Sequence, residues 1–335
     1  MSRATAHLLA LQEELGRSLP FERFMREALY HPEFGYYTAR IRDVGARGDF
    51  STFATLGNSL AQFLARWILE NKARDVIEVG PGNGQLAAQI LGELGWWHRR
   101  SVRYHLVDVD GPLRAAQDQR LRGFRVQRHP DLPSALRATG GHAWIFSNEL
   151  PDAFPCRVFE LTPEGWLELH LQLGADGIRE VLLPTTLPES TAFSADFRPG
   201  QRVEIHESYR HWLRSWAGRW TSGAMLTIDY GDPMPALYHR RTGGTLRGYA
   251  HHQRLTGHEI YQAPGRLDLT ADVNFSDLEK WGEELGWKTT RHATLHEFLP
   301  ATTEPQFLEV AKAFRVLDQC PSAAFGLPTT GKITG

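Results

Sequence analysis

The first candidate for chemistry is a glycine-rich turn that follows a short apolar segment. Glycines stand at positions 80, 82 and 84, and Glu78 lies two places before the first of them. Glycine permits a sharp turn and a close approach between backbone and ligand. A dinucleotide turn would need the spacing Gly-x-Gly-x-x-Gly, but residue 85 is Gln. The spacing and the carboxylate favour a cationic ligand, and we predict S-adenosylmethionine bound at Glu78, Gly80, Pro81, Gly82 and Gly84.

A second carboxylate, Asp108, ends the next apolar segment. A carboxylate at that position can accept hydrogen bonds from both hydroxyls of a ribose. We therefore predict Asp108, with its neighbour Val109, as a contact to the adenosyl part of the ligand. A dinucleotide enzyme, or a glycine turn that serves only strand–helix packing, is the alternative at this stage.

A third polar group, Asn148 and Glu149, directly follows another apolar run. Ligands of open α/β sheets bind beyond the carboxyl ends of the strands, so both residues are expected beside the reacting methyl group. A carboxylate there can hold a guanidinium by paired hydrogen bonds and leave one nitrogen facing the methyl donor. We predict Glu149 as the residue that orients the acceptor, and Asn148 as a contact to substrate or cofactor. The alternative is a polar loop that caps its own backbone, above all at Asp152.

The elements that must position these residues alternate between strand and helix. Apolar runs predict strands at 76–79, 104–109, 143–148 and 224–230, with helices through 86–94 and 112–121. Such alternation is typical of a parallel, doubly wound α/β sheet. The flanking regions predict N-terminal helices near 8–15, 21–29 and 56–70, antiparallel strands within an insertion at 157–200, a helix at 275–286 and a closing strand at 289–298.

The composition narrows the class of protein. A formal net charge of -2 and a pI near 6.7 give no global positive field that would favour a nucleic-acid or an anionic-membrane partner. Cys156 and Cys320 are the only cysteines, which excludes a disulfide framework and a thiolate metal site. His251, His252, His258 and Glu259 lack a defined ligand spacing, so we predict no metal site. No apolar run is long enough to span a membrane and the N-terminus is a poor signal peptide, so a cytoplasmic location is expected.

An ordered set of motifs resembles the MidA-like methyltransferases, whose members include a mitochondrial arginine methyltransferase needed for assembly of respiratory complex I. The matching segments are 21–30, 32–37, 45–50, 78–84, 113–117, 148–159, 229–231, 245–249 and 264–273. The resemblance implies a class I methyltransferase fold, a Rossmann-like and mostly parallel seven-stranded sheet with an N-terminal helical extension and an inserted β-rich segment. It also implies S-adenosylmethionine as donor, a protein arginine as acceptor, and Gly48, Asp49 and Phe50 as lid residues over the cofactor.

The expected organisation is an N-terminal helical extension with the lid loop at 1–74, a methyltransferase core at 75–156 and 201–300, the insertion at 157–200, and a C-terminal helix and tail at 301–335. Residues 51–55 depart from the family pattern, which has a Thr-Ser-Pro-Glu-like stretch there. Tyr36, Tyr37 and Tyr249 could shape an acceptor channel or serve packing alone. The expected acceptor is a protein, with a respiratory-complex subunit and a homodimer as further expectations. The rivals are a small-molecule methyltransferase and a non-catalytic assembly protein of the same fold.

Overall fold

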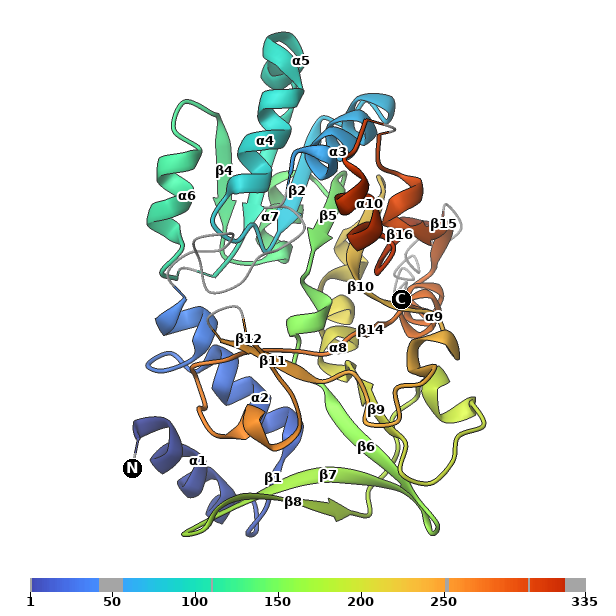
Figure 1. Cartoon of the computed structure of the whole chain (residues 1–335). Helices are drawn as coiled ribbons and strands as arrows, with labels where there is room; N and C mark the ends of the chain where they lie inside the picture. Colours follow the sequence, from blue (N-terminus) through green and yellow to red (C-terminus); the bar gives the residue numbers. More distant parts are fainter. Residues whose placement is uncertain (1, 42–56, 110, 251–252, 301, 323–335) are drawn as a thin grey trace, which may run out of the picture.

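A large central sheet forms the upper half of the molecule in Figure 1. The computed structural model describes residues 2–41, 57–109, 111–250, 253–300 and 302–322. The strand order is β15 (Trp287–Thr294), β16 (Phe314–Pro321), β10 (Met225–Asp232), β5 (Trp144–Asn148), β2 (Asp75–Val79), β3 (Arg103–Val107) and β4 (Val126–His129), with β14 (Val273–Asn274) beside β10. The strands from β10 to β4 are parallel, whereas β16 runs antiparallel to both of its neighbours. The predicted α/β class and mostly parallel sheet are confirmed, but the described sheet has eight strands where seven were expected, because the short β14 also pairs with β10.

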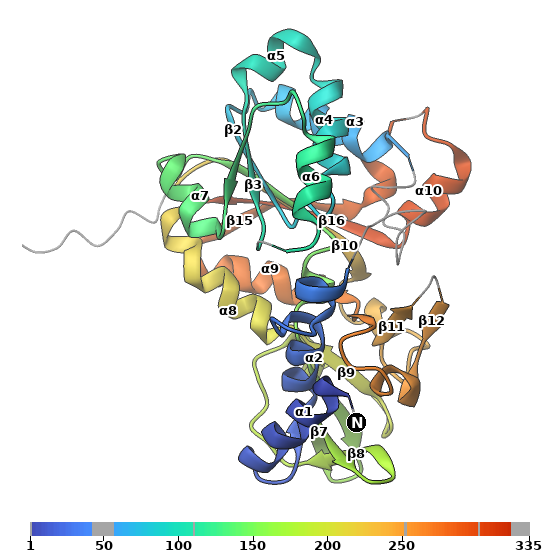
Figure 2. The ribbon, with the colours of Figure 1, turned by 90° about the vertical axis from the view of Figure 1, so that its left-hand side faces the viewer.

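Helices cover both faces of this sheet (Figure 2). One face packs against α3 (Ser59–Glu70), α4 (Gln85–Glu93) and α10 (Pro305–Ala311), and the other against α7 (Leu132–Ala138), α8 (Glu207–Trp216) and α9 (Phe275–Glu284). Neighbouring residues of one strand enter opposite cores, as Val76 and Ile77 do in β2. Strands buried on both faces explain the continuous apolar runs in the sequence.

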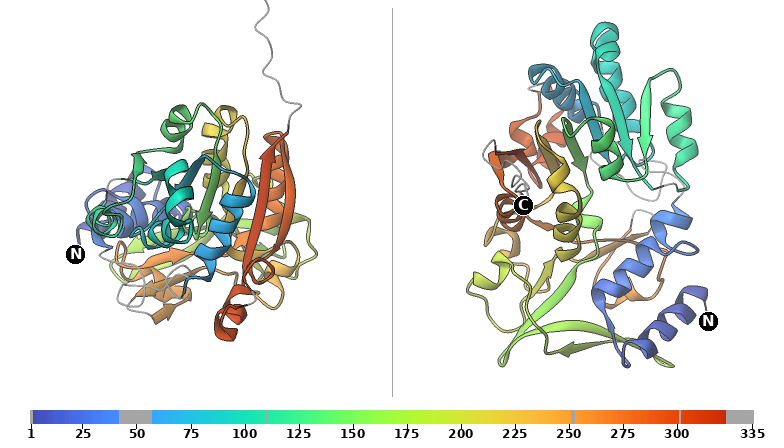
Figure 3. Two further views of the ribbon diagram at one scale, coloured as in Figure 1. Left: turned by 90° about the horizontal axis from the view of Figure 1, so that it is seen from above. Right: turned by 180° about the vertical axis from the view of Figure 1, so that it is seen from behind.

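A second, antiparallel sheet lies below the first. It joins β1 (Leu19–Pro20), β7 (Gly165–Gly174), β6 (Arg157–Thr162) and β9 (Arg202–Ile205), with β8 (Gly177–Leu183) paired to β7. The N-terminal helices α1 (Arg3–Glu14) and α2 (Phe21–Tyr30) pack on it and form one apolar core with β6 and β7 (Figure 3). The predicted insertion and the N-terminal extension therefore build a common lobe. The insertion was expected to end at residue 200, but β9 continues its sheet because β9 pairs with β6.

Two smaller features complete the fold and were not predicted. A three-stranded sheet of β11 (Arg247–Ala250), β12 (Gln253–Leu255) and β13 (Asp268–Thr270) lies between the main sheet and the lower lobe (Figure 1). Strand β16 falls in the region where only a helix and a tail were expected, and it lies between β10 and β15 in the main sheet. Within the described ranges, no helix is both long and apolar enough to cross a bilayer.

Candidate active site

A cavity of about 840 Å³ opens at the carboxyl ends of β2, β3 and β5. A volume of this size suits a small-molecule ligand. Most of the predicted site residues line it: Glu78, Gly80, Pro81, Gly82, Asp108, Val109, Asn148 and Glu149. The structure thus brings together residues from three separate strand ends, as the α/β topology requires.

The glycine turn adopts a conformation that other residues rarely take. The φ angles of Gly80, Gly82 and Gly84 are 70°, 52° and 80°. A Cβ atom on Gly80 would lie 3.1 Å from the Leu150 side chain, inside the cavity wall. Gly84 does not line the cavity; a Cβ there would meet the Cα of Gln117 at 3.3 Å. Gly84 therefore permits helix packing, while Gly80 and Gly82 face the ligand space.

Glu78 is a buried carboxylate at the floor of the cavity. Its Oε2 accepts a hydrogen bond of 2.8 Å from the Tyr104 hydroxyl, and 3% of its surface is exposed. Burial, with a smaller contribution from the charge of Asp108, raises the pKa of Glu78 to about 8. A cation bound beside it would stabilise the ionised form. The site therefore suits a positively charged ligand such as S-adenosylmethionine, and opposes a phosphate.

Gln117 in α6 (Arg114–Arg120) connects the glycine turn to Asp108. Its Nε2 donates to the Gly82 carbonyl at 2.8 Å and to Asp108 Oδ2 at 2.6 Å. Its Oε1 accepts a bond of 2.8 Å from Arg128. Gln117 is buried and its three bonds fix the position of Asp108 relative to the turn. Sequence reasoning gave it no role, although it lies in one of the family-like segments.

Glu149 and Asn148 line the cavity at the carboxyl end of β5. Glu149 has a φ of 52°, which is uncommon for a non-glycine residue, and its N–H donates to the Ile228 carbonyl at 2.9 Å. Asn148 Nδ2 donates to Glu149 Oε1 at 3.1 Å. The buried Asn148 Oδ1 has no hydrogen-bond partner among the residues that the structure describes. An amide oxygen held in this way is available to a ligand.

The part of the cavity that Glu149, Asp152 and Asp268 line also has tyrosine walls, and we call it the acidic chamber. Asp152 and Asp268 line it, and Asp229 lies behind Asp152, whose N–H donates to Asp229 Oδ2 at 3.1 Å. Burial, strengthened by the charge of Glu149, raises the pKa of Asp152. Burial also raises the pKa of Asp229, with Asp152 as the next cause. Crowded carboxylates of this kind are stabilised by a cationic ligand.

The chamber walls come from segments that are distant in the sequence. Tyr37, in the π-helix Tyr36–Arg40, donates its hydroxyl to Asp268 Oδ1 at 2.5 Å. The Tyr30 ring stacks on Tyr37 with centroids 5.6 Å apart, and its hydroxyl donates to the Ala153 carbonyl at 2.9 Å. Tyr37 and Tyr249 line the cavity, as the channel hypothesis requires, whereas Tyr36 is buried and does not.

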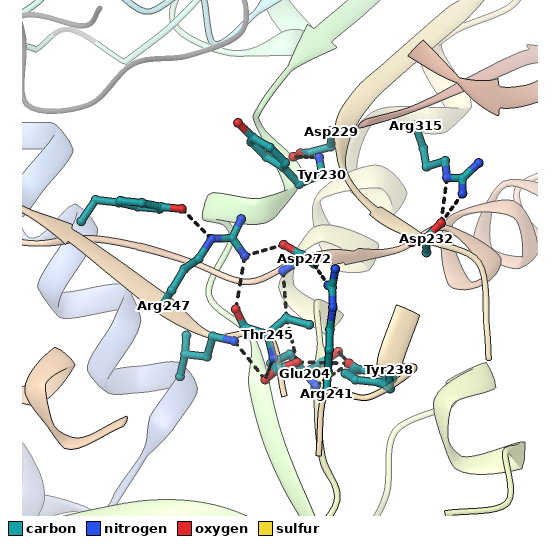
Figure 4. Close-up of polar contacts among 12 residues, drawn as sticks. Glu204, Asp229, Tyr230, Asp232, Tyr238, Arg241, Thr245, Arg247, Asp272 and Arg315 are labelled. Carbon is teal, nitrogen blue, oxygen red and sulfur yellow. Dashed lines mark hydrogen bonds and ion pairs between the residues drawn. The ribbon is translucent and has the colours of Figure 1, made fainter. Parts of the chain in front are cut away.

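The cation Arg247 is part of the chamber wall, and Arg26 lines the same cavity. The Arg247 guanidinium is directed toward Asp272, with which it forms an ion pair (Figure 4). The same guanidinium lies 5.5 Å from the centroid of Tyr230 and 5.9 Å from that of Tyr249. Asp272 in turn accepts from Arg241, and its backbone N–H donates to Thr245 Oγ1 at 2.9 Å. Arg247 is therefore held in place by protein contacts.

Several predicted or weighed residues lie outside the site or outside the described ranges. The lid candidates Gly48, Asp49 and Phe50, the segment 51–55, and His251 and His252 belong to the ranges that the structure does not describe.

Elsewhere, His7, Glu27 and His31 bring three potential metal-ligand atoms within 4.8 Å of one another. In this structure His7 is hydrogen-bonded to Glu27 at 3.0 Å, and His31 Nδ1 accepts from the Glu33 N–H at 3.2 Å.

Comparison with known proteins identifies relatives over most of the chain. Residues 55–293 match the family model described as "Putative S-adenosyl-L-methionine-dependent methyltransferase". Protein arginine methyltransferase NDUFAF7, mitochondrial, from Danio rerio is 30% identical over 295 residues, which cover 77% of this chain and 67% of the relative. The Mus musculus protein of the same name is 29% identical, over 78% of this chain and 65% of its own length. This chain thus spans just under two thirds of the length of the mouse relative.

A solved structure extends the comparison to the cofactor. The crystal structure of a Burkholderia thailandensis protein bound to S-adenosyl-homocysteine superposes with a TM-score of 0.80 at 26% identity, over 94% of this chain and 91% of that one. S-adenosyl-homocysteine is what remains of S-adenosylmethionine after methyl transfer, so this likeness supports the predicted cofactor. The expected cytoplasmic location is contradicted, because the curated relatives are named as mitochondrial proteins.

Proposed function

This chain belongs to the family of putative S-adenosyl-L-methionine-dependent methyltransferases, and we propose that it methylates a guanidinium nitrogen of an arginine in a protein. The observation that carries the proposal is the place of Glu149. This carboxylate lines the same cavity as the glycine turn and the acidic, tyrosine-lined chamber, and its charge acts on Asp152 in that chamber. The arginine methyltransferase names of the mitochondrial relatives support the same acceptor.

The residues around the glycine turn would hold the methyl donor. Glu78 would face its cationic amino acid part, and Asp108, positioned by Gln117, would accept the ribose hydroxyls. Gly80 and Gly82 would let the ligand lie against the backbone. When bound, S-adenosylmethionine supplies a sulfonium methyl group that is already activated for transfer.

The chamber residues would hold the acceptor. A guanidinium is planar and cationic, so carboxylates and aromatic walls recognise it together. Glu149 would accept two guanidinium N–H bonds and turn one nitrogen toward the methyl carbon, while the Asn148 amide keeps the Glu149 carboxylate in place. Asp268, fixed by Tyr37, would offer a second carboxylate on the opposite wall.

The transfer itself needs alignment more than a strong base. The nitrogen–carbon bond forms as the carbon–sulfur bond breaks, and the sulfur keeps the electron pair. The methylated guanidinium then loses one N–H proton, which Glu149 can accept and pass to water.

A pair of variants tests the assignment. Glu149→Gln should lower turnover by about 100-fold or more, while leaving the Kd for S-adenosyl-homocysteine within about twofold. The matched control is Glu164→Gln, because Glu164 is an exposed residue in the β6–β7 turn. Full activity of Glu149→Gln would contradict the role of this carboxylate.

A labelled-methyl assay on cell lysate tests the acceptor class. Label in a protein band, located on arginine by mass spectrometry, is the expected result. Label found in small molecules alone would favour the small-molecule rival, and no label in any fraction would favour a non-catalytic assembly protein. A respiratory-complex subunit as acceptor, and a homodimer, stay predictions of the family resemblance.

A further inference from the structure

Two adjacent, exposed tryptophans lie away from the active-site cavity. Helix α5 (Gly95–Ser101) follows α4 and precedes β3, so it lies at the amino ends of the strands. In Figures 1 and 2 it projects beyond the rest of the fold at the end opposite the lower lobe. Trp97 is 77% exposed and Trp96 is 48% exposed. Adjacent exposed tryptophans are costly in water and mark an interaction surface.

Arginines lie on the same helix as the two tryptophans and in the turn beside it. The Arg100 guanidinium lies 3.9 Å from the centroid of the Trp96 ring, and Trp96 and Trp97 pack edge to face at 4.4 Å. The Arg99 guanidinium lies 5.2 Å from the Phe124 ring, which places the turn at 121–125 beside α5. That turn carries the exposed residues Arg122 and Arg125. We call Trp96, Trp97, Arg99, Arg100, Arg122 and Arg125 the distal tip.

The charge of the distal tip is not compensated locally. None of its four arginines forms an ion pair with a residue that the structure describes. The sequence of α5, Gly-Trp-Trp-His-Arg-Arg-Ser, contains no carboxylate. By contrast Arg103, two positions beyond the helix, pairs with Asp75. The tip is therefore a cationic projection within a chain whose formal net charge is -2.

We propose that the distal tip binds the surface of an anionic phospholipid bilayer. Tryptophan prefers the interface between water and hydrocarbon, where its ring is buried and its N–H stays hydrated. Arginine guanidiniums bind lipid phosphates, and each cation near an anionic surface strengthens binding about fivefold. The distal tip is convex, and a bilayer can bind it without a preformed pocket of complementary shape. Attachment here leaves the active-site cavity open, because that cavity lies at the opposite ends of the strands.

Vesicle co-sedimentation of the full chain tests the inference independently of methyl transfer. The probes are vesicles of phosphatidylcholine alone and of phosphatidylcholine with phosphatidylglycerol at about 7:3. The expected result is binding to the anionic vesicles and little binding to the neutral ones. Trp97→Ser should weaken the binding about tenfold. The double variant Arg99→Ser and Arg100→Ser should weaken vesicle binding by about fivefold for each arginine removed. Added salt should also weaken the binding, because it screens the attraction between the arginines and the lipid phosphates.

The matched control combines Leu15→Ser and Arg179→Ser, because Leu15 is 50% exposed and Arg179 is an exposed arginine in the lower lobe. This control should bind vesicles as the unaltered chain does. All variants are first compared by thermal unfolding, so that loss of binding is not confused with loss of the fold. The inference is overturned if anionic vesicles are not bound, or if the tip variants bind as well as the control. Self-association that is lost in Trp97→Ser, without vesicle binding, would also overturn it and assign the tip to a second copy.

Discussion

The hydrogen bonds by which Gln117 connects Gly82 to Asp108 can be tested for their effect on cofactor binding. Replacing Gln117 with Leu keeps a side chain of similar volume but removes all three hydrogen bonds to Gly82, Asp108 and Arg128. The Asp108 carboxylate then loses the donor that lies 2.6 Å from it. We expect Asp108 to leave the position from which it can accept ribose hydroxyls.

The magnitude follows from the kind of bond removed. A hydrogen bond to a charged group contributes about 1.5–3 kcal/mol. If that energy is lost from cofactor binding, the Kd for S-adenosyl-homocysteine rises about 10- to 150-fold. The partly buried Gly82 carbonyl and the Arg128 guanidinium also lose a partner, so thermal unfolding should occur at a lower temperature as well.

Isothermal titration calorimetry with S-adenosyl-homocysteine provides the assay. The control is Gln119→Leu, which makes the same chemical change two residues later at an exposed position of the same helix. Gln119→Leu should bind as the unaltered chain does. If Gln117→Leu is folded and its Kd stays within about twofold of the control, the hydrogen bonds of Gln117 do not prepare the site and the reasoning is refuted.

Three further predictions follow from the site. Burial raises the pKa of Glu78 from 4.5 to about 8, so its protonated form stabilises the cofactor-free fold at low pH, and this stabilisation is lost as the pH rises through about 8. In Glu78→Gln, the free energy of unfolding measured with urea should therefore fall less between pH 4.5 and about 8 than in the unaltered chain. An unchanged pH profile would contradict the assignment. Arg247→Met should lower the free energy of unfolding, measured with guanidinium chloride, by about 3 kcal/mol because the buried Asp272 loses a partner. Arg241→Met should lower the same free energy by less than about 1 kcal/mol because the side chain of Arg241 is 45% exposed. Equal losses of stability in the two variants would refute the prediction. Tyr37→Phe should raise the KM for a protein acceptor about tenfold through loss of the bond to Asp268, and a weakened affinity for S-adenosyl-homocysteine would count against its place in the acceptor half.

The donor half of the site could be predicted from the sequence because its information is local. Glu78 and the glycines lie within seven residues of one another, and Asp108 ends the next strand. A strand followed by a tight turn and a helix fixes where such residues point, whatever the rest of the chain does. Asn148 and Glu149 could be placed for the same reason, because the end of a parallel strand defines the edge of the sheet at which they lie.

The acceptor half could not be predicted in the same way. Tyr37 meets Asp268 across 231 positions of the chain. Such contacts depend on how the lobes pack, which hydrophobic periodicity does not encode. The strand β16 was missed for a related reason, because its antiparallel pairing with β10 and β15 depends on partners elsewhere in the chain.

This division between local and distant contacts has a consequence for specificity. Arg247 and Asp268 come from the small sheet between the lobes, and Tyr30 and Tyr37 come from the N-terminal helices that pack on the lower lobe. Glu204 in β9 accepts the Thr245 N–H at 2.9 Å and so connects the antiparallel sheet to the strand that carries Arg247. The walls of the proposed acceptor chamber are thus supported by the added lobe, whereas the floor of the proposed donor site is supported by the main sheet. We therefore expect a change in the lobe to alter which acceptor is recognised without altering how the donor is held.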